Sequence, residues 1–180
     1  MNLRHIILIS LAALLSTGCA PTYKVPTEGV LSKIRYVSET ESALLNAGAF
    51  IVEDTNCKSK KMIAALYGLM LANNRKDMNM PLGNEFVSSQ KTETYIAANT
   101  PHIFDFTWAD GSIYSQIYSC NKTMIFTPKE NRMYEASFTM LSNTECEVKI
   151  NEIIKNSKGN YTRKSVPDAK LHDVQCNRPM

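Results

Sequence analysis

The chain has 180 residues, with 20 Lys or Arg against 17 Asp or Glu, and its formal net charge is +3 at pH 7. This balance is too close to neutral for the basic surface that nucleic-acid binding requires, so we expect no nucleic-acid partner. The length suits one domain with a sizeable core.

The first 19 residues have the features of an export signal. Arg4 makes the start basic, residues 6–15 form an apolar run of ten residues, and small side chains at residues 16–18 precede Cys19. This order predicts a secretory signal peptide. The apolar run is too short to cross a bilayer comfortably, which takes about 20 apolar residues.

This segment resembles the lipobox of bacterial lipoproteins, in which a small residue precedes a cysteine that receives a diacylglycerol before the signal peptide is removed. Ser16 stands where the family usually has leucine, and Leu15 lies one position earlier. The resemblance implies that residues 1–18 are a signal peptide and that Cys19, carrying acyl chains such as palmitate, holds the protein on a membrane. Two or more chains anchor stably. Ala20, where aspartate would favour inner-membrane retention, implies the outer membrane, facing the periplasm, if the organism has two membranes.

Removal of the signal peptide leaves a single domain behind a short tether. The signal takes away one basic residue, Arg4, and no acid, so 19 Lys or Arg remain against 17 Asp or Glu, a net charge of +2. Residues 20–29 contain two prolines and one glycine, and together with Cys19 we interpret them as a tether (residues 19–29) that extends up to about 35 Å. Residues 30–180 are expected to form one β-rich periplasmic domain.

Four cysteines follow Cys19, and an even number in an exported protein predicts two disulfides. Three pairings are open. We favour Cys120–Cys146, which would join neighbouring strands of one antiparallel region, and Cys57–Cys176, which would fasten the C-terminal tail to the first half. The wide scatter of these cysteines argues against structural zinc.

One segment, residues 60–73, has apolar residues at helical spacing and is apolar nearly all round. The pattern predicts an accessory helix buried in the core or against a sheet. An interfacial helix lying on lipid is the alternative. The residues that recur at this spacing are Met62, Ile63, Leu66, Tyr67, Met70 and Leu71.

Most of the remaining chain shows the period-two pattern of strands. We expect strands near residues 30–37 and 49–54, and then a meander of consecutive antiparallel strands over residues 92–154. Asp110 and Gly111 predict a hairpin, and Asn121 a tight bend. Edge strands are expected at residues 161–166 and 170–176. Short strands at regular spacing indicate a mainly β fold, an antiparallel β-sandwich or an open barrel.

No catalytic motif stands out in the sequence. There is no Gly-x-Ser-x-Gly, no His-Glu-x-x-His and no glycine-rich phosphate loop. His102 lies in a strand pattern beside Phe104 and Phe106, which favours a structural histidine, and His172 is the other histidine after Cys19. We therefore expect no enzyme, no cofactor and no metal site.

Two binding alternatives remain open. Phe104, Phe106 and Trp108 share one strand face and either line a ligand groove or, as we favour, belong to the core. Methionine thioethers are ligands for Cu(I), and four methionines lie within nineteen residues. The alternative for them is helix core and loop. They are Met62, Met70, Met78 and Met80.

The sequence thus predicts a lipid-anchored envelope protein whose domain is non-catalytic and binds a protein partner, as an accessory part of a membrane-associated assembly. A periplasmic inhibitor or immunity lipoprotein directed against a hydrolase is the first alternative. A methionine-rich copper-binding protein and a hydrolase of cell-wall material are weaker ones.

Overall fold

The computed structural model describes residues 22–38, 46–54, 57, 59–65, 77–82, 91–110 and 118–172. These residues form strands and their connections. The strands are β1 (Leu31–Ser38), β2 (Asn46–Val52), β3 (Lys60–Ala65), β4 (Lys91–Ala97), β5 (His102–Asp110), β6 (Tyr118–Phe126), β7 (Met133–Met140), β8 (Cys146–Lys155), β9 (Tyr161–Ser165) and β10 (Lys170–Leu171).

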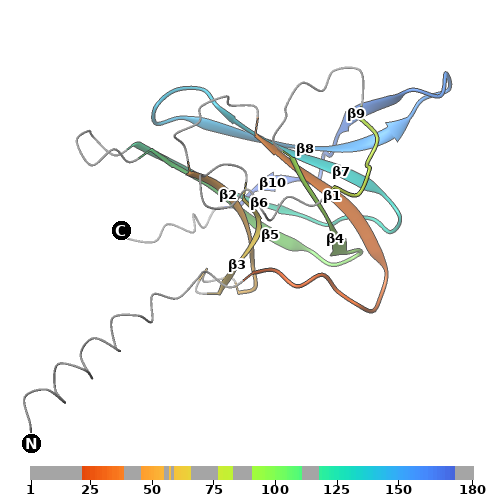
Figure 1. Ribbon diagram of the computed structural model, residues 1–180, viewed down its shortest axis with the longest axis horizontal. Coiled ribbons are helices and arrows are strands. Elements are labelled where there is room, and N and C mark those ends of the chain that lie inside the picture. The colour runs from red at the N-terminus through yellow and green to blue at the C-terminus, as the bar shows by residue number, and fades with distance from the viewer. Residues whose placement is uncertain are drawn as a thin grey trace, which may run out of the picture.

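The strands make two five-stranded sheets (Figure 1). One has the order β4-β1-β7-β8-β9 and is called the β1 sheet below. The other has the order β10-β6-β5-β2-β3 and is called the β5 sheet. In the β1 sheet, β1 and β7 run parallel, with Lys33 paired to Met133, and the other pairings are antiparallel. The mainly β fold and the sandwich architecture are confirmed.

The core lies between the two sheets and is rich in aromatic side chains. Phe104 and Phe106 are fully buried, and Trp108 is 5% exposed. Tyr36 of β1 faces both phenylalanines, with ring centroids 6.2 Å apart in each case, and Phe106 stacks on Phe138 at 6.4 Å. Such pairs add to the stability gained from burial. The aromatic stripe of β5 is therefore core.

The predicted helix at residues 60–73 is wrong where the structure describes it. Residues 60–65 form β3, which pairs antiparallel with β2 through a register shift at Ala49 and Phe50. Helical spacing and a buried strand are hard to distinguish in a short apolar run. Lys60 and Lys61 also disfavour a helix start, because they oppose its dipole. Residues 66–73 lie outside the described residues.

The predicted single meander is divided between the sheets. β4 pairs with β1 and not with β5, while the hairpins β5–β6 and β7–β8 lie in different sheets.

The bend predicted at Asn121 is wrong. Asn121 lies inside β6, paired with Thr107, and β6 begins at Tyr118, opposite Asp110. Gly111 lies outside the described residues. Alternation shows which residues face the core, but it does not specify which strands pair.

The disulfide Cys120–Cys146 is confirmed, with Cα atoms 6.1 Å apart. Its position differs from the expectation, because Cys120 lies in β6 and Cys146 in β8. It therefore joins the two sheets across the core instead of neighbouring strands of one sheet. Cys57 is also disulfide-bonded. Cys176, the partner predicted for it, lies outside the described residues, so that pairing stays a prediction.

Residues 22–29, called the N-terminal arm below, lie against the sandwich. Thr22 forms a parallel bridge with Met62 of β3, and the Tyr23 N–H donates to the Met62 carbonyl at 2.8 Å. The Tyr23 side chain is half-buried and packs on the core. This part of the expected tether is therefore docked on the edge of the β5 sheet. In the described part of the chain, no helix is long and apolar enough to cross a membrane.

Candidate ligand pocket between the sheets

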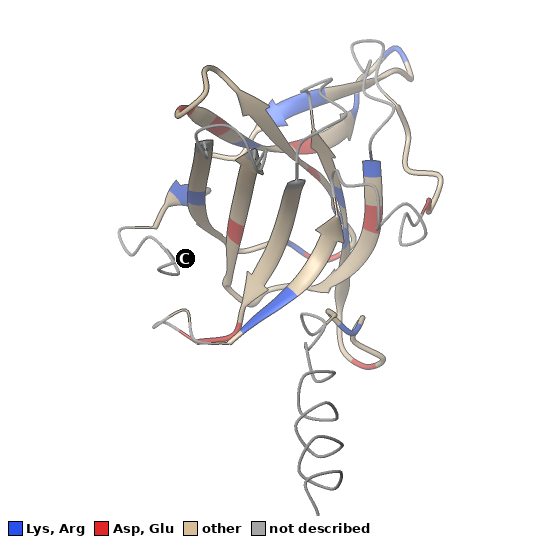
Figure 2. Cartoon of the chain, turned by 60° about the vertical axis from the view of Figure 1, so that its left-hand side comes forward, with Lys and Arg blue, Asp and Glu red and all other residues tan. Residues whose placement is uncertain are grey.

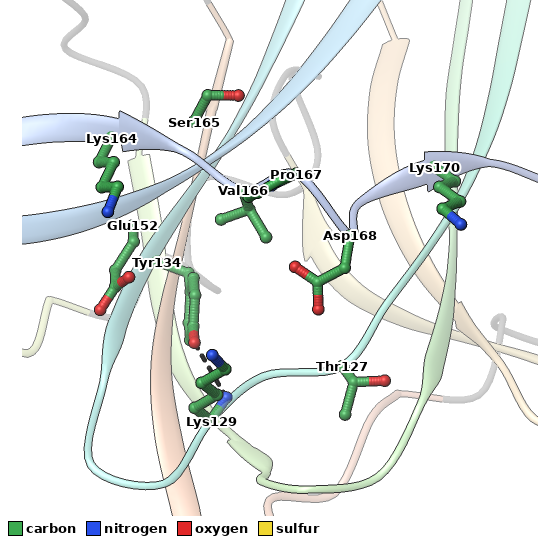
Figure 3. Close-up of a pocket in the computed structure, with 10 residues that line it drawn as sticks. All are labelled: Thr127, Lys129, Tyr134, Glu152, Lys164, Ser165, Val166, Pro167, Asp168 and Lys170. Carbon is green, nitrogen blue, oxygen red and sulfur yellow. Dashed lines mark hydrogen bonds between the residues drawn. The ribbon is translucent and has the colours of Figure 1, made fainter.

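A pocket of about 510 Å³ opens where the chain passes from one sheet to the other after β9 (Figure 3). Its size lies in the usual range for small-molecule sites. The lining residues come from the β6–β7 connection, from β7 to β10 and from the β9–β10 connection. They are Thr127, Lys129, Tyr134, Glu152, Lys164, Ser165, Val166, Pro167, Asp168 and Lys170.

The crossing between β9 and β10 forms one wall of the pocket. Val166 donates its N–H to the Ile150 carbonyl at 3.2 Å, and Ala169 donates to the Val166 carbonyl at 3.2 Å. Both side chains pack on the core cluster. Pro167 lies between them, and proline favours a fixed turn because its ring holds φ near −65°. The wall is thus held by the core and by backbone bonds.

Tyr134 forms an opposite wall. Its ring is 2% exposed and meets Phe126 edge to face at 4.8 Å. Its hydroxyl oxygen accepts the backbone N–H of Lys129 at 2.9 Å, the bond drawn in Figure 3. Burial raises the pKa of Tyr134 above its ordinary value, an effect that the Lys129 N–H opposes and the charge of Glu152 reinforces. The hydroxyl therefore stays neutral at neutral pH.

Charge around the pocket is incompletely compensated. Lys164 lies opposite Glu152 in register, yet the ion pair of Glu152 is with Arg132, at 3.1 Å. Within the described ranges, no ion pair is found for the side chains of Lys129, Lys164, Lys170 or Asp168. Three ammonium groups and one carboxylate of the pocket lining thus have no ionic partner among the residues that the structure describes.

This arrangement suits the binding of an anion. Ammonium groups are strong donors to carboxylate and phosphate oxygens. The hydroxyls of Thr127 and Ser165 add neutral donors, and Val166 and Pro167 supply an apolar surface. Asp168 would select for an amine or hydroxyl on the same ligand.

A second polar cluster lies on the outer face of the β1 sheet, because Arg35 alternates along β1 with the core residues Ile34 and Tyr36. Figure 2 shows that charged positions occur within strands of the sandwich. Arg35 is 1% exposed and donates to Glu135 at 2.8 and 2.9 Å. It also lies 3.5 Å from a carboxylate oxygen of the fully buried Glu93. Arg163 donates to the other oxygen of Glu135 at 2.5 Å. The cluster joins β4, β1, β7 and β9.

Residues 77–82, called the strap below, cover this cluster. Arg35 donates to the carbonyls of Met80 and Pro81 at 3.2 to 3.3 Å. One oxygen of Glu93 accepts the N–H groups of Met78 and Met80, at 2.6 and 3.1 Å. Because its partners are strand and strap groups of the same fold, we assign this cluster a structural role.

The β5 sheet has a smaller cluster around Asp105, which is fully buried. One oxygen accepts bonds from Asn121 at 2.8 Å and Thr123 at 3.1 Å. The other meets the ammonium group of Lys60, which reaches across β2 from β3, at 2.5 Å. The polar run in β6 that looks like a bend in the sequence is thus the set of donors for Asp105.

The two histidines lie apart from the pocket lining. His102 Nε2 donates to the Ala97 carbonyl at 2.8 Å, and burial lowers the pKa of the ring. This is the geometry of a structural histidine. His172 donates its backbone N–H to the Thr123 carbonyl at 2.8 Å.

The structure separates the methionines proposed for copper. Met62 lies in β3 of the β5 sheet, whereas Met78 and Met80 belong to the strap on the β1 sheet. The backbone N–H groups of Met78 and Met80 donate hydrogen bonds to the Glu93 carboxylate. Met70, like Cys19, lies outside the described residues.

Sequence reasoning missed the pocket. Its charged residues are spread from Lys129 to Lys170 and share no motif. The one local signal is Pro167, which follows the end of β9 by two residues and lies in the crossing between the sheets.

The fold and pocket together define a disulfide-linked β-sandwich with a cationic pocket between its sheets. Comparison with protein-family models, with curated proteins and with solved structures gave no match.

Proposed function

We propose that this protein is a lipid-anchored, non-catalytic binding protein of the bacterial envelope, and that its pocket holds a small molecule bearing carboxylate or phosphate groups. The observation that carries the proposal is the set of ammonium groups of Lys129, Lys164 and Lys170 around the pocket, for which the described residues supply no ionic partner. In this role it is an accessory component that keeps its ligand beside the membrane-associated assembly that uses it.

Two features support the envelope location. The first is the signal-like start that ends at Cys19. The second is the Cys120–Cys146 disulfide, because disulfides persist in oxidising compartments such as the periplasm.

Calorimetric titration of the purified protein tests the pocket. We expect inorganic phosphate and citrate to bind, glycerol not to bind, and the affinity to fall as salt is added, because exposed charges are screened. The triple variant Lys129→Gln, Lys164→Gln, Lys170→Gln should abolish binding without changing the unfolding midpoint.

The matched control changes three lysines outside the pocket, Lys149→Gln, Lys155→Gln and Lys158→Gln. The same charge is then lost, so anion binding that depends on the pocket should persist. Failure of the wild-type protein to bind either anion would overturn the proposal, as would an equal loss of binding in both triple variants.

The anchor has its own test. Radiolabelled palmitate should enter the wild-type protein in cells, and the change Cys19→Ser should abolish this labelling. Incorporation that survives the change would contradict lipidation at this residue.

A further inference from the structure

The N-terminal arm is fixed at both of its ends. At its start, Thr22 and Tyr23 hold the edge of β3 through the bridge and the 2.8 Å hydrogen bond to Met62. Directly after its end, the carbonyl of Val30 accepts the N–H of Ala98 at 2.8 Å, beside the β1–β4 pairing. The arm thus spans from the β5 sheet to the β1 sheet.

The side chain of Tyr23 attaches the arm to the core. It packs on the core cluster, and burial raises its pKa to about 12. It also lies close enough to Tyr36, a fully buried core residue, to affect the pKa of that hydroxyl. Release of the arm would therefore expose core surface.

The docked arm leaves very little chain free. Cys19 precedes Thr22 by three residues, and three peptide units span at most about 10 Å. A lipid on Cys19 would therefore bring the edge of β3 close to the headgroups. A free tether of residues 20–29 would have allowed any orientation.

We propose that the N-terminal arm and the edge of β3 form the face that rests on the lipid bilayer, with the β8–β9 hairpin directed away from it. The proposal rests on the lipidation of Cys19 in the proposed function. Figure 1 places β3 and the tip of the β8–β9 hairpin at opposite ends of the sandwich. The partner of this face is the headgroup layer, which Lys24 and Lys61, each within two residues of the Thr22–Met62 bridge, would meet.

Native lysines report this orientation without new labels. The mature lipidated protein is bound to vesicles of phosphatidylethanolamine and phosphatidylglycerol, and flotation confirms attachment. A membrane-impermeant amine reagent is then applied, and labelling is mapped by mass spectrometry. We expect Lys24 and Lys61 to be labelled several-fold more slowly than in the soluble Cys19→Ser protein, whereas Lys158, in the exposed turn of the hairpin, should be labelled at the same rate in both.

A second variant lengthens only the short segment between Cys19 and the N-terminal arm. Insertion of twenty Gly and Ser residues between Ala20 and Pro21 adds a flexible chain of about 25 Å and leaves the arm intact. Labelling of Lys24 and Lys61 should then return to the soluble rate while the protein still floats.

The outcomes separate the two proposals. Flotation with Lys24 and Lys61 labelled at the soluble rate would overturn the orientation alone, and so would equal protection of Lys158. Failure of the lipidated protein to float would overturn the anchor and the orientation together.

Discussion

The outer faces of the two sheets both bury charge, but with opposite sign. In the β1 sheet the central group is Arg35, a cation between the carboxylates of Glu93 and Glu135. In the β5 sheet it is Asp105, an anion that meets one ammonium, that of Lys60, and neutral donors. Loss of Arg35 leaves two buried carboxylates with one cation each from another strand position, Arg163 for Glu135 and Lys91, at 3.7 Å, for Glu93. Loss of Lys60 leaves one carboxylate, which keeps the neutral donors of Asn121 and Thr123.

The largest effect should come from Arg35→Met. Removing one partner of a buried ion pair costs about 4 kcal/mol of unfolding free energy, because the remaining charges stay desolvated. Urea unfolding measures this loss. The control Arg132→Met removes an arginine that is 57% exposed and pairs with Glu152, and should cost less than about 1 kcal/mol.

A rescue variant sharpens the result. Adding Glu93→Gln and Glu135→Gln to Arg35→Met removes both buried carboxylate charges while keeping hydrogen-bond acceptors for the strap and for Arg163. We expect it to recover most of the lost stability. If the triple variant is no more stable than Arg35→Met, the loss arises from packing and not from charge.

The next effect concerns the covalent link between the two sheets. The double change Cys120→Ala, Cys146→Ala opens a loop with a sequence separation of 26 and should lower the unfolding free energy by roughly 3 kcal/mol. Trp108 of β5, the only tryptophan, reports on the β5 sheet by fluorescence, and circular dichroism reports on both sheets. Coincident transitions in the wild type and separate ones in the variant would show that the disulfide couples the sheets.

Lys60→Met tests the β5 side of the comparison. Lys60 is 10% exposed, has one carboxylate partner where Arg35 has two, and leaves Asp105 with two neutral donors. The loss should therefore be about 3 kcal/mol, at the lower end for a buried ion pair and smaller than for Arg35→Met. The neighbouring change Lys61→Met removes only a surface pair with Glu53 and should leave the urea midpoint unchanged. A larger effect of Lys60→Met than of Arg35→Met would reverse the comparison.

The smallest effect is the pH dependence from His102, at the start of β5. Its pKa in the folded protein lies below the ordinary value of 6.5, mainly because of burial, so the folded state takes up a proton less readily than the unfolded state. Its contribution is present above pH 6.5 and is lost as the pH falls from there toward the folded pKa. His102→Gln should reduce the decline in urea midpoint between pH 7.5 and pH 5. An unchanged decline would exclude His102 as its source.

Alternation in the sequence was enough to predict the fold class and the core stripe of Phe104, Phe106 and Trp108. It failed at β3, where the apolar residues over 60–73 recur at helical spacing, but residues 60–65 form a strand that pairs with β2. It also failed for Arg35 and Asp105, because a charge that alternates with core residues looks solvent-exposed until the strap or Lys60 is seen to cover it.

The candidate site was harder to predict from the sequence than the fold. The number of cysteines and their context predict disulfides, and the strand pattern favoured Cys120–Cys146 among three open pairings, but its position across the core was not predicted. The pocket depends on the path between β9 and β10, and local sequence does not determine which sheet a short edge strand joins. Its lysines therefore resembled ordinary surface residues.

The parallel pairing of β1 with β7 has a consequence for the order of folding. Lys33 pairs with Met133, and Arg35 bonds Glu135 across 100 residues of chain. A chain that emerges N-terminus first must keep β1 without its central neighbour until β7 appears, so the middle of the β1 sheet closes late. Folds dominated by such distant pairings fold slowly and expose strand edges meanwhile. This protein should therefore depend on protection from aggregation from the time β1 is synthesised until the last third of the chain, which contains β7, is available to pair with it.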